Sequence, residues 1–133
     1  MDAERIAAIP IFAGLTGAER VSVAAAAGEL TVDAGTELTR EGDFGHGFFA
    51  IEDGTADVVR DGALVAQLGP GDVFGEIALV ASGRRTASVV ATSPMRLITL
   101  FKRDLWALEE QMPTFSVALR ETVLRRLEDP VGA

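Results

Sequence analysis

Two short segments of the chain, separated by a loop, carry residue types that bind anions. The first is Phe74-Gly75-Glu76-Ile77-Ala78-Leu79 and the second is Arg84-Arg85-Thr86-Ala87-Ser88-Val89. If a helix begins at Gly75, its first free N–H groups point out of the glycine end and attract negative charge. Arg85 adds a guanidinium fork from the far end of the loop, and Thr86 adds a hydroxyl donor. The pattern therefore predicts a phosphate cradle.

Glu76 indicates which phosphate compound fits the cradle. Its carboxylate would repel a phosphate but would accept a hydrogen bond from a sugar hydroxyl, and a phosphate with a ribose is a nucleotide. One arginine suits the single charge of a phosphodiester, whereas a triphosphate normally requires a GxxxxGK[ST] loop, and Lys102 lies in no such pattern. The residues favour a cyclic nucleotide, with an inert surface ion pair between Arg85 and Glu76 as the alternative.

Composition excludes several other classes of function. The 133 residues include no cysteine and one histidine, His46, so thiolate and multi-histidine metal sites are excluded, and a cupin-like metalloenzyme is disfavoured. The net charge of −8 disfavours nucleic acid and anionic membranes as partners. No apolar run approaches the ~20 residues that span a bilayer, and the start lacks the order of a signal peptide. We expect a cytoplasmic protein without catalytic residues.

Charge is unevenly distributed along the chain. Residues 1–80 hold 14 acidic and 4 basic side chains, whereas residues 81–133 hold 6 acidic and 8 basic ones. Between Glu41 and Gly83 the only basic residue is Arg60, and then Arg84 and Arg85 follow together. A site for an anion must therefore be built locally.

The elements that would position this site fall into three parts. Residues 1–29 read as two helices: Ile6 and Ile9 lie on one face of the first, which Pro10 ends, and Thr16 begins the second with Glu19 in a capping box. Residues 30–101 alternate apolar and polar positions between turns spaced 8 to 12 residues apart, the pattern of about eight strands in a sandwich or barrel. Residues 75–81 interrupt the alternation and fit either a strand or a short helix.

The last part, residues 102–129, reads as two further helices. The first runs from Lys102 to Met112 with Trp106 as a buried anchor, and the second begins at Pro113. Its expected apolar side consists of Phe115, Leu119, Val123, Leu124 and Leu127. The length allows one domain, residues 1–133. Its expected class is α+β, mainly β: an eight-stranded antiparallel, jelly-roll-like β-roll flanked by N-terminal helices and two C-terminal helices.

Four motifs in order resemble those of the cyclic nucleotide-binding domain family. Residues 74–89 are similar to its phosphate-binding cassette, and the likeness covers nearly the whole chain. The other three motifs are Ile9-Pro10-Ile11-Phe12-Ala13-Gly14-Leu15, the segment Glu41-Gly42-Asp43 through Asp53-Gly54, and Leu68-Gly69-Pro70-Gly71-Asp72. The cassette looks most like that of the channel-type branch, because Thr86 stands where kinase regulatory subunits have alanine. Arg84 stands at a position where other members of the family commonly have a proline.

The resemblance implies a role for each site residue. It puts Arg85 on the cyclic phosphate with Gly75 and the backbone of Ile77 and Ala78, and it puts Glu76 on the ribose 2′-hydroxyl. Thr86 would assist the phosphate and reach a syn guanine. In the last helix, Arg126 falls where channel-type domains place a residue over the purine.

The same resemblance implies a regulatory module rather than an enzyme. It would bind cAMP, or cGMP, without a metal or other cofactor, and would signal to a downstream effector domain or protein by moving its C-terminal helices. No nucleic acid is an expected partner, and the domain itself is not expected to bind a membrane. The alternative is an interaction module that keeps the fold and no longer binds nucleotide.

Overall fold

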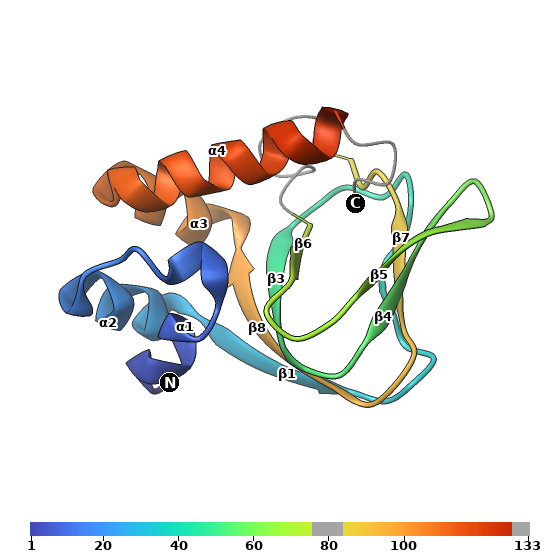
Figure 1. The fold of residues 1–133 in the computed structure, drawn as a ribbon, viewed down its shortest axis with the longest axis horizontal. Coiled ribbons are helices and arrows are strands. Elements are labelled where there is room, and N and C mark those ends of the chain that lie inside the picture. The colour runs from blue at the N-terminus through green and yellow to red at the C-terminus, as the bar shows by residue number, and fades with distance from the viewer. Residues whose placement is uncertain (76–83, 129–133) are drawn as a thin grey trace.

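The computed structural model describes residues 1–75 and 84–128, without the side chains of residues 123 and 126–128. A layer of helices lies against one side of a β-roll (Figure 1). The helices are α1 (Ala3–Ala7), the 3₁₀ turn η1 (Pro10–Phe12), α2 (Gly17–Ala26), α3 (Lys102–Gln111) and α4 (Pro113–Glu128). Helices from both ends of the chain therefore form one layer, whereas the sequence predicted only that helices precede and follow the roll.

Eight strands in the described part of the chain form the roll. They are β1 (Gly28–Val32), β2 (Glu37–Thr39), β3 (Gly47–Asp53), β4 (Ala56–Arg60), β5 (Ala63–Leu68), β6 (Val73–Phe74), β7 (Ser88–Ala91) and β8 (Met95–Phe101). They make two four-stranded sheets, ordered β1-β8-β3-β6 and β2-β7-β4-β5. Every pairing between these strands is antiparallel. The predicted fold class is confirmed.

Local signals set the beginnings of the N-terminal helices. The Thr16 side chain accepts a hydrogen bond from the Glu19 N–H, and the Glu19 carboxylate accepts one from the Thr16 N–H, which confirms the capping box. The prediction that Pro10 ends the first helix is wrong, because α1 already stops at Ala7 and Pro10 instead opens the 3₁₀ turn. Proline suits this position, since the first N–H of a helix has no partner to lose.

The sheet β1-β8-β3-β6 separates two apolar clusters. On its helical side, Phe48 packs with Phe12, and the ring of Phe12 stacks on Phe115 of α4 at 5.3 Å between centroids. On its other side, Ile51 and Leu97 lie inside the roll. Because successive strand residues point to opposite faces, one sheet joins the helical layer to the interior of the roll.

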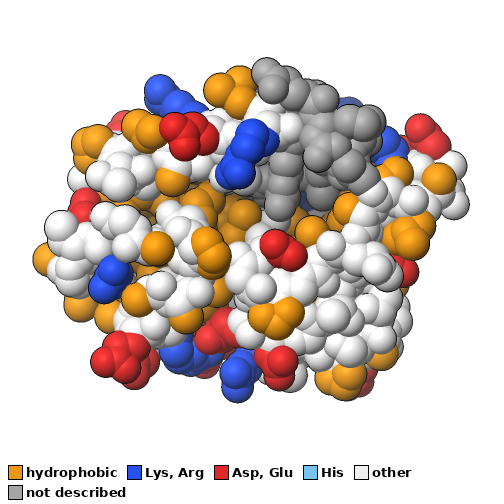
Figure 2. Space-filling model, viewed as in Figure 1, with side chains coloured by type: hydrophobic (Ala, Val, Ile, Leu, Met, Phe, Trp, Pro, Cys, Tyr) orange, Lys and Arg blue, Asp and Glu red, His pale blue; other side chains and the backbone are white. Residues whose placement is uncertain are grey.

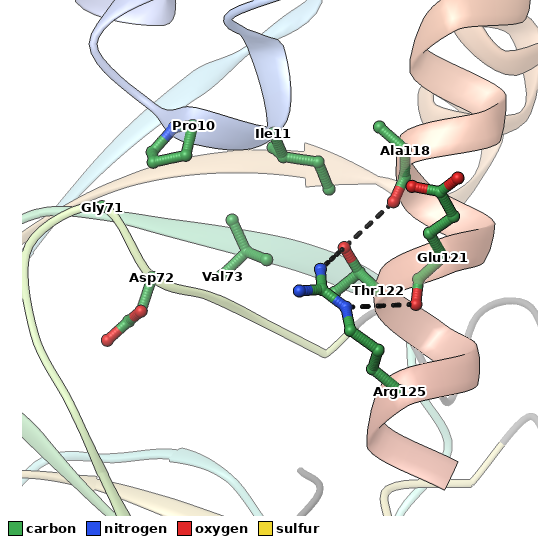
Figure 3. Close-up of a pocket in the computed structure, with 9 residues that line it drawn as sticks. All are labelled: Pro10, Ile11, Gly71, Asp72, Val73, Ala118, Glu121, Thr122 and Arg125. Carbon is green, nitrogen blue, oxygen red and sulfur yellow. Dashed lines mark hydrogen bonds between the residues drawn. The ribbon is translucent and has the colours of Figure 1, made fainter. Parts of the chain in front are cut away.

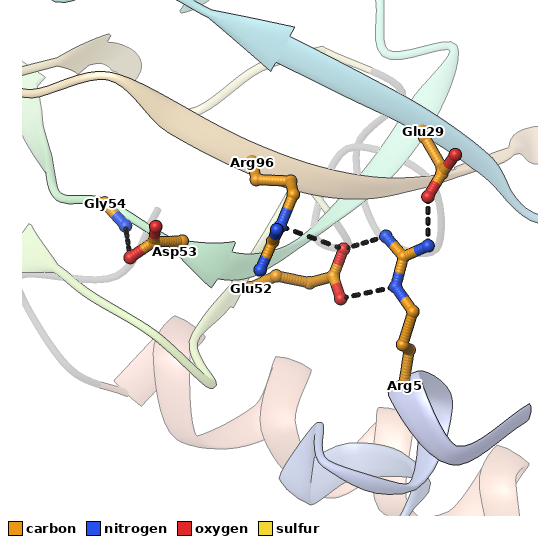
Figure 4. A network of polar contacts seen from close by, with 6 residues as sticks. All are labelled: Arg5, Glu29, Glu52, Asp53, Gly54 and Arg96. Atoms are coloured by element: carbon orange, nitrogen blue, oxygen red, sulfur yellow. Dashed lines mark hydrogen bonds and ion pairs between the residues drawn. The ribbon is translucent and has the colours of Figure 1, made fainter. Parts of the chain in front are cut away.

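A polar network also joins the helices to this sheet (Figure 4). The Arg5 guanidinium of α1 donates through Nε to Glu52 Oε2 at 2.9 Å and pairs as well with Glu29 of β1. Glu52 lies on β3 with its side chain only 9% exposed, and Arg96 Nε lies 3.9 Å from its other oxygen. Chiefly because of its hydrogen bond to Glu52, the pKa of Arg5 is raised above its ordinary value.

Two apolar side chains on the C-terminal helices lie elsewhere than predicted. Leu124 was expected on the packed side of α4 but is 58% exposed, whereas Phe115 and Leu119 are buried as expected. The helical spacing explains the difference, because Leu124 is nine residues, or about two and a half turns, from Phe115 and therefore lies on the opposite side of α4. Trp106 is 46% exposed instead of buried, and its ring lies 4.7 Å from Lys102 Nζ.

The surface carries charges of both signs. On the face seen in Figure 2, acidic and basic side chains are scattered and do not gather into a basic patch. Within the part of the chain that the structure describes, no helix has the length and apolarity to cross a membrane.

Candidate functional site

The structure brings Arg85 and Gly75 into direct contact. Arg85 Nη1 donates to the Gly75 carbonyl at 2.9 Å, and Arg85 Nη2 donates to the Gly47 carbonyl at 2.8 Å. Gly47 begins β3 and Gly75 follows β6, and these two strands are paired. The guanidinium carbon also lies 5.9 Å from the ring centroid of Phe49. The guanidinium of Arg85, which is predicted to bind the phosphate, is thus held in one orientation at the end of a sheet.

Gly75 is a position that only glycine fits. Its φ is +91°, in the region that residues with a side chain rarely adopt. A Cβ there would lie 2.5 Å from Arg85 Nη1 and 2.9 Å from the Gly47 carbonyl oxygen. The absence of a side chain therefore allows the approach of Arg85, in addition to the access for an anion that the sequence suggested.

The loop between β2 and β3 holds the backbone of the arginine segment. Arg85 N donates to the Asp43 carbonyl at 2.7 Å, and Gly42 N donates to the Arg85 carbonyl at 2.9 Å. Arg84 donates through Nη1 to the Gly42 carbonyl at 2.9 Å, and its guanidinium carbon lies 4.3 Å from the ring centroid of Phe44. Sequence reasoning assigned this loop no contact with the site. Its one signal was the Glu41-Gly42-Asp43 motif.

Thr86 presents a buried hydroxyl. Its Oγ1 has no hydrogen-bond partner among the described residues, whereas its carbonyl accepts a hydrogen bond from Arg60 Nε at 3.1 Å. Buried hydroxyls are normally paired, because leaving one without a partner costs about 1 to 3 kcal/mol. A hydroxyl of this kind next to Arg85 is suited to a ligand oxygen. Sequence reasoning found Thr86 but did not connect it with Arg60.

The remaining predicted site residues are less fully described. Glu76, Ile77 and Ala78 lie outside the described residues, and so does the choice between strand and helix for residues 76–81. Arg126 lies on α4, but its side chain is outside the described part. Of the seven predicted residues, the structure therefore brings together Gly75, Arg85 and Thr86.

A cavity of about 500 Å³ opens beneath the outer half of α4 (Figure 3). Its walls come from η1, from the turn leading into β6 and from α4. Arg125 lines this cavity and its guanidinium turns back onto its own helix, with Nη2 3.4 Å from Thr122 Oγ1 and Nε 3.4 Å from the Glu121 carbonyl. Val73 of β6 lies on the opposite wall, two residues before Gly75. The cavity separates α4 from the strand that leads into the site.

The donor set determines which chemistry the site can support. A fixed guanidinium and a neighbouring hydroxyl match the oxygens of a phosphate, which accept hydrogen bonds at two positions from one arginine. Among the described residues, no group of three or more His, Asp or Glu side chains could hold a metal ion. The guanidinium and the hydroxyl together are chemically suited to an anion.

Comparisons with known proteins agree with this geometry. Residues 29–112 match the family model described as the cyclic nucleotide-binding domain. The chain is 32% identical over 125 residues to a cyclic nucleotide-gated potassium channel of Rhizobium etli, covering 94% of this chain and 35% of the channel. It is 39% identical over 95 residues to the cAMP-dependent protein kinase regulatory subunit of Schizosaccharomyces pombe, covering 71% of this chain and 23% of that protein.

The solved structures give the same result for the fold. The crystal structure of the catabolite activator protein of Thermus thermophilus superposes with a TM-score of 0.81 at 31% identity, over 90% of this chain and 58% of that one. The structure of cAMP-bound PfPKA-R also gives a TM-score of 0.81, at 24% identity, over 95% of this chain and 46% of that one. This chain therefore spans only part of the length of these proteins.

Proposed function

The chain belongs to the cyclic nucleotide-binding domain family, and on that premise we propose that it is a regulatory module that binds cAMP or cGMP. One observation carries the proposal. The Arg85 guanidinium is fixed between the carbonyls of Gly75 and Gly47, beside the buried hydroxyl of Thr86, which has no partner among the described residues. This arrangement supports binding of the singly charged phosphate of a cyclic nucleotide by these groups.

Preorganisation supports the assignment of the phosphate to Arg85. Because backbone carbonyls already hold the side chain, little rotamer freedom is lost when a ligand binds. A hydrogen bond to a charged group contributes about 1.5 to 3 kcal/mol, so a bidentate arginine supplies a large part of the ~8 kcal/mol of a micromolar complex. Thr86 Oγ1 would donate to a second phosphate oxygen and lose its burial penalty.

The other contacts follow from the family pattern of the sequence. Glu76 would accept a hydrogen bond from the ribose 2′-hydroxyl, and the backbone of Ile77 and Ala78 would meet the phosphate. Arg126 would lie over the purine from α4. We favour cAMP over cGMP, because several similar proteins are named for cAMP. The ligand requires no metal or other cofactor.

The proposed output is a movement of the C-terminal helices. Residues 1–29 would form the N-terminal helical part, residues 30–101 the ligand-binding roll and residues 102–129 the responding helices. The cavity of about 500 Å³ beneath α4 offers room for a second helix position. Nucleotide can shift the helices only if it binds one arrangement more tightly than the other. Such a module would act in the cytoplasm on a downstream effector domain or protein, without catalysis of its own.

Calorimetry with cAMP and cGMP tests the proposal directly. We expect the wild-type chain to bind at least one of them and Arg85→Ala to weaken that binding at least tenfold, since a charged hydrogen-bonding pair is lost. Arg103→Ala is the matched control, because Arg103 is an exposed arginine on α3. Lack of binding by folded wild-type protein at millimolar nucleotide would refute the proposal and favour the interaction module without a ligand.

A further inference from the structure

Arg60 occupies an unusual place for a charged side chain. In β4 it follows Ala56 and Val58 at every second position, and the side chains of these two residues belong to the apolar cluster inside the roll. Period-two alternation puts Arg60 on the same face as these two residues. An aliphatic residue would continue this pattern without removing a charge from water, so a partly buried guanidinium here is costly unless it makes specific hydrogen bonds.

The strand register brings Arg60 to the predicted phosphate site. Val59 of β4 pairs with Ser88 of β7, so the next residue on β4 lies beside the segment that precedes Ser88. Arg60 Nε donates to the Thr86 carbonyl at 3.1 Å, across 26 residues of sequence. The residue after Arg85 is therefore held by a second arginine, which comes from β4, the strand paired with β7 in the same sheet.

The hydrogen bonds around Thr86 continue into two neighbouring turns. Asp61, next to Arg60, donates its N–H to Glu41 Oε1 at 3.0 Å. The N–H of Glu41 in turn donates to Ser88 Oγ at 2.9 Å. Arg60, Asp61, Glu41 and Ser88 thus connect the turn after β4, the loop after β2 and the start of β7. Thr86 lies within this set of connections, and its hydroxyl has no partner among the described residues.

We propose that Arg60 is a positioning residue for nucleotide binding that acts through Thr86. The inference rests on the proposed function. By holding the Thr86 carbonyl, Arg60 fixes the peptide unit that carries the Thr86 side chain, so the hydroxyl meets a phosphate oxygen without further ordering. Without Arg60 the Thr86 hydroxyl is still present but no longer has a fixed direction. The affinity that preorganisation contributes is then lost.

A double-mutant cycle tests whether Arg60 acts through Thr86. The proteins are wild type, Arg60→Met, Thr86→Val and the double variant, each titrated calorimetrically with cAMP and cGMP. We expect each single variant to bind about tenfold more weakly, the equivalent of one hydrogen bond. The double variant should bind no more weakly than the weaker single variant, because both changes remove the same contact.

Two controls separate positioning from a loss of folding. Arg40→Met removes another arginine of the roll, one whose guanidinium hydrogen-bonds Glu37 on the surface, and should leave affinity unchanged. Arg60→Lys keeps a positive donor and should restore part of the affinity lost in Arg60→Met. If Arg60→Met does not fold, the cycle is measured with Arg60→Lys in its place.

The outcomes distinguish this inference from the proposed function. Strictly additive losses, or unchanged affinity in the Arg60 variants, would overturn the role of Arg60 while leaving nucleotide binding intact. Absence of binding by the wild-type protein would overturn the proposed function and this inference together. A cycle with coupling close to the full single-variant loss, with Arg40→Met unchanged, would support it.

Discussion

Replacing Gly75 with alanine should disrupt the site through Arg85. The new Cβ would lie 2.5 Å from Arg85 Nη1 and 2.9 Å from the Gly47 carbonyl oxygen, both far inside normal contact distance. Because the Gly47 carbonyl belongs to a paired strand, the arginine is the group that must move. Its movement breaks the 2.9 Å hydrogen bond to the Gly75 carbonyl.

The expected magnitude has two parts. Adoption of a positive φ by alanine costs about 1 to 2 kcal/mol. Loss of a hydrogen bond from a charged donor costs about 1.5 to 3 kcal/mol. Together they predict a loss of about 2.5 to 5 kcal/mol in the free energy of unfolding. Nucleotide affinity should fall at least about tenfold because Arg85 is displaced.

Gly35→Ala is the matched control. Gly35 has a φ of +90°, almost the same as Gly75, but no atom lies within 4 Å of a Cβ built on it. The control variant therefore shows the backbone strain alone. Denaturant unfolding gives the two stability losses, and calorimetry gives the two affinities.

Comparing Gly75→Ala with Gly35→Ala can refute the role given to the contact between Gly75 and Arg85. Equal losses of stability in Gly75→Ala and Gly35→Ala, with nucleotide affinity unchanged in both, would show that the contact between Gly75 and Arg85 does not hold the site together. A larger loss of stability in Gly75→Ala with unchanged affinity would remove Arg85 from the binding site but leave its structural role.

Three further predictions concern the scaffold. Phe12→Ala should cost about 3 to 5 kcal/mol of stability in denaturant unfolding, because a fully buried ring between two others is lost; a cost below about 1 kcal/mol would contradict this packing. Glu52→Gln should cost about 1 to 3 kcal/mol by leaving Arg5 without its main carboxylate, whereas Glu37→Gln, in an exposed pair, should cost under about 1 kcal/mol; equal losses would argue against the network. Burial raises the pKa of Glu109, so the folded state binds its proton more tightly than the unfolded state does, and stability falls as pH rises through that window. Glu109→Gln should therefore be slightly more stable than wild type at neutral pH and lose this gain in acid, and an unchanged pH profile would contradict the shift.

Much of the fold follows from short-range patterns in the sequence. The capping box at Thr16 and Glu19 involves residues three apart, so the local sequence determines its geometry. The structure contains it as predicted. Alternation through residues 30–101 predicted the strands because most of them have one face in an apolar cluster. The residues of the proposed site could also be picked out, since Gly75, Arg85 and Thr86 are close in the chain.

The exposure of Leu124 follows from the helical period, which the predicted apolar side did not respect. Leu124 is nine residues from Phe115, or about two and a half helical turns, so the two side chains lie on opposite sides of α4. Phe115 is buried and Leu124 is exposed, as this spacing requires. For Trp106 the tertiary packing decided the outcome: the side chain is 46% exposed, and Lys102 Nζ lies 4.7 Å from its ring centroid.

The sequence by itself determined that an arginine, a hydroxyl and a glycine stand together in a pattern suited to a phosphate. Only the tertiary structure decided what holds them, because those partners are distant in the chain. Arg85 is fixed by the Gly47 carbonyl, 38 residues away, and Thr86 by Arg60, 26 residues away. Backbone carbonyls and a lone strand arginine leave no motif of their own, and strand register, set by the packing of the whole roll, brings them to the site.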